Sequence, residues 1–180
     1  MDLNESVVES HRIHEGRIVN LRVDTVVLPD GRTAQREIVE HSGAIAAVPV
    51  DNDGRVLLVR QFRLAAGRPL LEIPAGGMEE GEDPAECAVR ECAEEIGRVP
   101  GRLTPLFSAW VAPGYATEII HCFLAEDLVT ERKDGDVDEF VEVVPATWTE
   151  IDQWIADGSI QDMKSIAALA IARTRLTPPR

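Results

Sequence analysis

Three glutamates lie within five residues of one another: Glu91, Glu94 and Glu95. On an α-helix, Glu91 and Glu95 would lie along the same edge because they are four residues apart, and Glu94 would lie about 100° around the same side. A glycine-rich turn, residues 76–81, precedes them and leaves room for backbone to approach an ion. Crowded carboxylate oxygens beside such a turn suit hard cations such as Mg2+ or Mn2+. The spacing therefore predicts a divalent-metal site, with a solvated acidic face as the alternative.

These glutamates need a helix to position them, and the sequence carries the boundary signals of one. Asp83 suits the N-cap, Pro84 the first helical position, and Gly97 the position just past the end. We therefore expect a helix over residues 84–96. One stripe of this helix is apolar and must face the core; it consists of Ala85, Ala88, Val89, Cys92 and Ile96.

Most of the remaining chain is expected to form β-strands, followed by two late helices. We expect strands over residues 17–28, 33–41, 44–50, 55–62, 70–74, 103–111, 119–125 and 140–144, and helices over 149–156 and 163–175. The turn at residues 51–54, Asp-Asn-Asp-Gly, predicts a hairpin between its two flanking strands. Many strands with one central helix and two late helices indicate an α+β fold or a mixed sandwich.

The length and the net charge of the chain limit the functions that it can have. The chain has 180 residues, the length of one ordinary domain, and a formal net charge of −14. So acidic a chain lacks the broad basic surface that attracts nucleic acid or an anionic membrane. No apolar run approaches the roughly 20 residues that span a bilayer, and the N-terminus lacks the pattern of a signal peptide. Cys87, Cys92 and Cys122 are expected to be reduced, buried thiols, which makes a cytoplasmic location the default.

The segment from Gly76 to Arg98, GGMEEGEDPAECAVRECAEEIGR, resembles the Nudix box, G-x5-E-x7-R-E-U-x-E-E-x-G-U, in which U is a bulky apolar residue. The positions that match are Gly76, Glu82, Arg90, Glu91, Glu94, Glu95 and Gly97. Cys92 at the first U and Arg98 at the last depart from the pattern, and neither position supplies a metal ligand in the family. The resemblance implies a Nudix hydrolase, an α/β/α sandwich of mixed β-sheet that cleaves a nucleoside diphosphate linked to another group. Here it would carry an N-terminal extension of antiparallel strands.

The same resemblance implies roles for the charged residues of the box. Glu91 and Glu95 would ligate divalent cations, Mg2+ or alternatively Mn2+, and Glu94 would be a further ligand or a catalytic carboxylate beside them. Arg90 would orient these carboxylates, and Glu82 would support the geometry of the loop and helix.

Outside the box, the segment LLEIPAG at residues 70–76 resembles the segment that precedes the box in ADP-ribose pyrophosphatases, and a later proline resembles the marker of that subfamily. The likeness implies that the carbonyl of Ala75 is a metal ligand. Arg63, and Arg36 reaching in from a partner subunit, would contact the diphosphate, while Glu72 would face the ribose or adenine. The residues that the likeness assigns to substrate binding are Arg36, Arg63, Glu72 and Pro113.

The resemblance also implies a catalytic base on the acidic loop at residues 131–139. Val137 stands where the family commonly has a glutamate, so the base is expected to be Glu139, or Asp138 in its place.

Together these features predict an Mg2+-dependent diphosphatase that converts ADP-ribose to AMP and ribose 5-phosphate. Residues 1–42 are expected to form a strand extension that makes a homodimer, and residues 43–176 the Nudix hydrolase domain, within a single domain overall. One alternative is a Nudix hydrolase of another nucleotide sugar, such as GDP-mannose or a UDP-sugar. The other is a non-catalytic nucleotide sensor, which would not need the complete set of metal-binding carboxylates.

Overall fold

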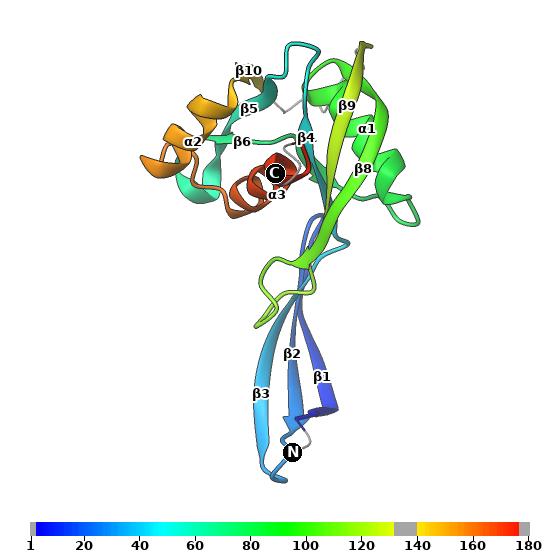
Figure 1. The fold of residues 1–180 in the computed structure, drawn as a ribbon. Helices are drawn as coiled ribbons and strands as arrows, with labels where there is room; N and C mark the ends of the chain where they lie inside the picture. Colours follow the sequence, from blue (N-terminus) through cyan, green and yellow to red (C-terminus); the bar gives the residue numbers. More distant parts are fainter. Residues whose placement is uncertain (1–2, 132–139, 177–180) are drawn as a thin grey trace. The chain divides into compact units, whose positions relative to one another are not determined.

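The computed structural model describes residues 3–131 and 140–176. Contacts between residues divide the chain into two compact units (Figure 1). The first comprises residues 1–43 and 110–119, and the second comprises residues 44–109 and 120–180.

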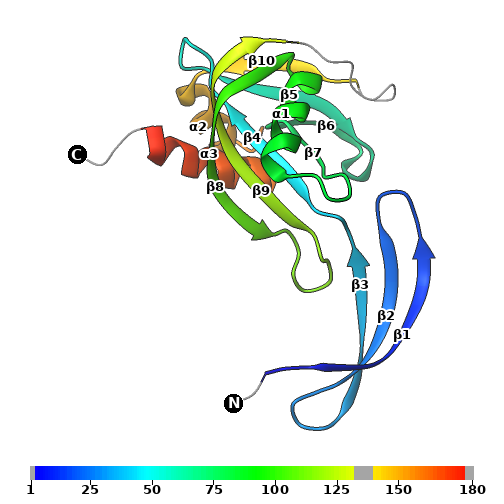
Figure 2. The same ribbon diagram turned by 90° about the vertical axis from the view of Figure 1, so that its right-hand side faces the viewer.

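The first unit contains a three-stranded antiparallel sheet in the order β1 (Ser6–Glu15), β2 (Asn20–Val27) and β3 (Thr33–Glu40) (Figure 2). The turn between β2 and β3 contains Gly31 at a φ of 84°, which glycine adopts without steric strain. Residues 110–119 join the unit through Val39. Its amide donates to the Tyr115 carbonyl at 2.8 Å, and the Thr117 amide donates to the Val39 carbonyl at 2.9 Å.

Strand β1 was not predicted, whereas the expected strand 17–28 corresponds to β2. All ten residues of β1 are exposed, so no alternation of apolar and polar residues marks the strand. Its ladder to β2 and a few polar side chains hold it in place. Ser10 Oγ donates to Asp24 at 2.6 Å, and Arg12 forms an ion pair with Glu40.

In its described residues, 44–109, 120–131 and 140–176, the second unit holds two sheets and three α-helices. One sheet is antiparallel, in the order β10-β5-β6; the other, in the order β7-β4-β9-β8, is mixed because β4 runs parallel to β9 and antiparallel to β7. The strands are β4 (Ala44–Pro49), β5 (Val56–Arg63), β6 (Arg68–Glu72), β7 (Ala75–Gly77), β8 (Arg98–Trp110), β9 (Ile119–Thr130) and β10 (Glu142–Ala146). The helices are the 3-10 turn η1 (Leu64–Ala66) and the α-helices α1 (Pro84–Glu95), α2 (Trp148–Ala156) and α3 (Met163–Leu176).

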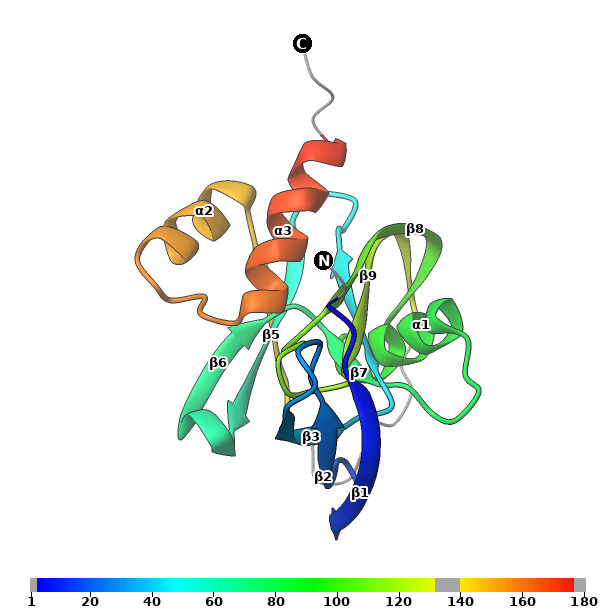
Figure 3. The ribbon, with the colours of Figure 1, turned by 90° about the horizontal axis from the view of Figure 1, so that it is seen from below.

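Helices cover both faces of the mixed sheet. Helix α1 packs on β4 and β7, helix α3 also packs on β4, and Figures 1 and 3 show the two helices on opposite sides of β4 and β9. Every residue of β4 is buried. In one core cluster, Cys92 and Ile96 of the expected apolar stripe meet Ala47 and Val59. The arrangement confirms the expected α+β fold, an α/β/α sandwich of mixed sheet.

The hairpin expected around residues 51–54 is wrong, although the turn itself forms. The Gly54 amide donates to the Asp51 carbonyl at 2.9 Å, but β4 and β5 belong to different sheets and meet through an isolated bridge between Val50 and Val56. Turn residues dictate the reversal of the chain locally, whereas the choice of ladder partner depends on distant strands.

All three cysteines are buried and free, as expected. Burial raises the pKa of each thiol to about 12, so all three stay protonated at neutral pH. Within residues 3–131 and 140–176, no helix combines the length and apolar character needed to cross a bilayer.

Candidate active site

Helix α1 begins and ends where its capping residues predict. The Asp83 side chain accepts a hydrogen bond from the Ala85 amide at 2.8 Å, and Pro84 occupies the first turn. The helix ends at Glu95, one residue earlier than expected, and Gly97 follows with a φ of 63°. Local signals therefore place the carboxylates of the box on one rigid element.

Two of these carboxylates are turned inward against strand β7. Glu91 and Glu95 are only 7% and 8% exposed. Glu95 Oε2 accepts a hydrogen bond from the Ala75 amide at 3.0 Å. The Glu91 carboxylate fills the space beside Gly76, where an added Cβ would lie 2.0 Å from Glu91 Oε1. The structure thus brings Ala75, Glu91 and Glu95 together, and glycine at 76 makes the approach possible.

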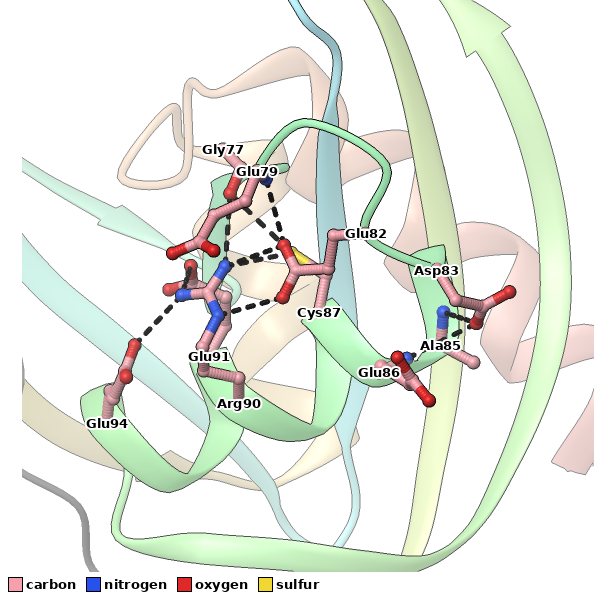
Figure 4. A network of polar contacts seen from close by, with 10 residues as sticks. All are labelled: Gly77, Glu79, Glu82, Asp83, Ala85, Glu86, Cys87, Arg90, Glu91 and Glu94. Atoms are coloured by element: carbon pink, nitrogen blue, oxygen red, sulfur yellow. Dashed lines mark hydrogen bonds and ion pairs between the residues drawn. The ribbon is translucent and has the colours of Figure 1, made fainter.

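The Arg90 guanidinium joins the remaining carboxylates into one network (Figure 4). Its Nη1 donates to Glu91 at 2.6 Å and to Glu94 at 3.1 Å. Its Nε and Nη2 donate hydrogen bonds to the two oxygens of Glu82 at 3.0 and 3.1 Å, and Nη2 also donates to the Gly77 carbonyl at 3.2 Å. The hydrogen bonds to Glu82 are the main reason that the pKa of Arg90 is raised. This geometry is what an arginine that orients carboxylates requires.

Glu82 ties the loop before the helix to the helix itself. Besides Arg90, its carboxylate accepts the Glu79 amide at 2.9 Å. The Arg90 hydrogen bond is the leading cause that lowers the pKa of Glu82 to about 2 from its ordinary value of 4.5. The ionised Glu82 carboxylate therefore stabilises the folded state fully above about pH 4.5, and this stabilisation is lost as the pH falls toward 2.

The donor set at α1 fits a hard divalent cation. Buried carboxylate oxygens next to a backbone strand are the ligands that Mg2+ and Mn2+ prefer, and the missing Cβ of Gly76 leaves room for Glu91. In the part of the chain that the structure describes, no three histidine, cysteine or acidic side chains converge on a ready-made ion site. Arg90 instead holds Glu91 and Glu94, so a bound cation would share or replace that contact.

Arg63 and Glu72, expected to contact different parts of a substrate, are paired with each other. Arg63 Nε and Nη2 each donate to one oxygen of Glu72 at 2.9 Å. Glu72 is only 2% exposed, and burial alone would raise the pKa of its carboxyl group. Hydrogen bonds and charge from Arg63 and Lys164 outweigh burial, so the pKa of Glu72 is lowered. The pKa of Arg63 is raised, chiefly by its hydrogen bonds to Glu72.

The other predicted substrate-binding residues lie in the first unit, and the predicted bases lie outside the described residues. Arg36 stands on β3 and forms an ion pair with Glu5, with 3.0 Å between Arg36 Nε and Glu5 Oε2. Pro113 lies in the 110–119 segment of the same unit. The two candidate bases, Asp138 and Glu139, fall outside the described residues.

Helix α3 begins at Met163, as expected, but sequence reasoning missed the contacts that its first turn makes. Lys164 forms ion pairs with Glu72 and, at 2.9 Å, with Asp162. Ser165 Oγ accepts the Ile73 amide at 2.9 Å and in turn donates to Asp162. The contacts with Glu72 and Ile73 span 92 positions of the chain, so no local motif reveals them.

Two family models match the chain. The model for the NUDIX domain matches residues 33–169, and the model for the nucleoside diphosphate sugar hydrolase N-terminal domain matches residues 5–39.

Curated relatives align over nearly the full length. An ADP-ribose pyrophosphatase of Bacillus subtilis (strain 168) is 38% identical over 169 residues, which cover 93% of this chain and 91% of the relative. A methanol dehydrogenase activator of Bacillus methanolicus is 39% identical over 167 residues, covering 92% and 90%. The crystal structure of an ADP compounds hydrolase shares the fold, with a TM-score of 0.87 and 22% identity over 98% of this chain and 96% of that one. From the family model and these relatives we conclude that the chain belongs to the Nudix family.

Proposed function

We propose that this Nudix enzyme hydrolyses the diphosphate of ADP-ribose, or of a related ADP-sugar, to AMP and a sugar phosphate. The observation that carries the proposal is the pair of buried glutamates, Glu91 and Glu95, set against the backbone of β7 and flanked by Arg90. The B. subtilis relative, an ADP-ribose pyrophosphatase, supports the choice of substrate.

Nudix hydrolases depend on divalent metal ions, and we propose Mg2+ as the ion here, with Mn2+ as a substitute. Bound cations would polarise the phosphoryl oxygens and neutralise a doubly anionic diphosphate in a chain of net charge −14. Glu91, Glu95 and the Ala75 carbonyl are the proposed ligands, with Glu94 beside them. Arg90 holds Glu91 and Glu94 in place before the ions arrive.

The remaining steps need groups that hold substrate and move a proton. The Arg63 guanidinium, held by Glu72, would donate hydrogen bonds to the diphosphate. A carboxylate from the acidic loop, Glu139 or Asp138, is the proposed base that takes a proton from the attacking water. The free, buried cysteines support the proposal of a cytoplasmic location, because thiols stay reduced there.

We also propose that the enzyme is a homodimer in which the strand extension supplies Arg36 to the neighbouring subunit. The support is that residues 5–39 match a model specific to nucleoside diphosphate sugar hydrolases and that β1 has no buried residue within the monomer. Sedimentation equilibrium is expected to give twice the monomer mass. A mass of one chain at micromolar concentration would contradict this arrangement.

A substrate panel tests the function directly. Purified protein with Mg2+ is incubated with ADP-ribose, NADH, GDP-mannose and UDP-glucose, and the nucleoside monophosphate released is measured. We expect the highest kcat/KM for ADP-ribose. Preference for GDP-mannose or UDP-glucose would establish another nucleotide sugar as the substrate, which the N-terminal family model equally accommodates. Absence of turnover with every compound would indicate a nucleotide-binding sensor.

A further inference from the structure

The first turn of helix α3 contributes a cation to a buried carboxylate beside the proposed diphosphate site. Glu72 has two cationic partners, Arg63 on the neighbouring strand and Lys164 on α3, and these two partners differ in how they bind it. Arg63 uses one edge of its guanidinium, Nε and Nη2, with both distances 2.9 Å. Its third nitrogen, Nη1, makes no hydrogen bond to Glu72 and has no hydrogen-bond partner among residues 3–131 and 140–176, so it can donate in another direction.

Lys164 is itself fixed by the residues around it. Its Nζ lies 2.9 Å from Asp162 Oδ2, and the same oxygen accepts the Ser165 amide at 2.9 Å. Ser165 Oγ accepts the Ile73 amide, which joins the start of α3 to the segment that leads into β7. The Lys164 side chain is only 17% exposed, so its interactions are poorly screened by solvent.

We propose that Lys164 is a positioning residue that holds Glu72, and through it Arg63, in the orientation that binds the substrate diphosphate; this inference rests on the proposed function. A buried carboxylate that loses its partners is strongly destabilised, and Lys164 gives Glu72 a second positive charge besides Arg63. With Lys164 as a second partner, Glu72 stays paired while Nη1 of Arg63 donates to a phosphate oxygen. Lys164 would therefore act on substrate affinity without touching the substrate.

The test is a comparison of KM and kcat for ADP-ribose in three variants. In Lys164→Met, KM is expected to rise about tenfold while kcat changes by less than about twofold, because ground-state positioning is lost. Lys164→Arg, which restores the charge, is expected to recover most of the loss. Arg173→Met is the matched control on the same helix, since Arg173 pairs with Asp152 and packs over Trp148 away from Glu72. It should leave both constants unchanged.

A double-variant cycle separates positioning from a general effect on folding. In an Arg63→Met background, Lys164→Met should raise KM no further, because the pathway through Arg63 is already absent. If Lys164→Met does not fold, the substitution is repeated in a Glu72→Gln background, which lacks the buried negative charge that Lys164 neutralises. In that background Lys164→Met should likewise have no effect on KM.

The outcomes distinguish this inference from the proposed function. Full additivity of the two substitutions, or an unchanged KM in Lys164→Met, overturns the positioning role while leaving the hydrolase intact. Wild-type protein that turns over none of the nucleotides overturns the proposed function and this inference together.

Discussion

Replacement of Glu95 by glutamine is expected to lower kcat for ADP-ribose by about a thousandfold or more, with the fold preserved. Glutamine keeps the shape of the side chain and an oxygen that can accept the Ala75 amide, so the contact between α1 and β7 survives. What disappears is one negative charge and, on the proposed mechanism, one anionic metal ligand. Metal ions supply several kcal/mol of transition-state stabilisation, and each 1.36 kcal/mol corresponds to about a tenfold change in rate.

The matched control for this substitution is Glu86→Gln, the same chemical change on the same helix. Glu86 is exposed in the first turn of α1, away from the buried edge that carries Glu91 and Glu95. It should leave kcat within about twofold, as surface substitutions usually do. Calorimetric titration with Mn2+ adds a readout independent of turnover and should show weaker binding only in Glu95→Gln. Mn2+ affinity and kcat close to wild type in that variant would exclude Glu95 as a metal ligand.

The sequence predicted the site helix well because everything that specifies it is local. An N-cap aspartate, a proline at the first position and a glycine after the last turn all act within a few residues of the helix they bound. The same is true of Arg90, whose partners lie within thirteen positions, at Glu82, Glu91, Glu94 and the Gly77 carbonyl. Residue spacing along the helix was therefore enough to predict which of these side chains contact one another.

Contacts between segments that are distant in the chain could not be predicted from sequence spacing in the same way. Arg63 and Glu72 lie on the paired strands β5 and β6 but are not opposite each other, because the antiparallel register pairs Arg63 with Arg68 and Val59 with Glu72. Such a register depends on a turn and on neighbouring strands. Lys164 lies farther away still, 92 positions after Glu72. Strand β1 escaped prediction for a different reason, because an all-exposed strand has no hydrophobic period.

Gly76 offers the sharpest test of the arrangement, because its missing side chain leaves the space that Glu91, a proposed metal ligand, fills. In Gly76→Ala, the new Cβ would lie 2.0 Å from Glu91 Oε1 and from Glu91 Cδ, far inside contact distance. The atoms in conflict are the tip of a flexible side chain, so Glu91 can rotate away and the backbone need not move. We therefore expect kcat to fall by about a hundredfold or more, since displacement of a catalytic group by an ångström already has that effect.

The same substitution should barely change stability, and this separates it from an ordinary core defect. We expect Tm to fall by no more than about 4 °C, which corresponds to about 1 kcal/mol in a chain of this size. Gly77→Ala is the adjacent control, because nothing lies within 4 Å of a Cβ built there and the carbonyl that Arg90 contacts is kept. A loss of kcat in Gly77→Ala equal to that in Gly76→Ala would mean that β7 tolerates no side chain at all. Only a loss confined to position 76 ties catalysis to the place that Glu91 occupies.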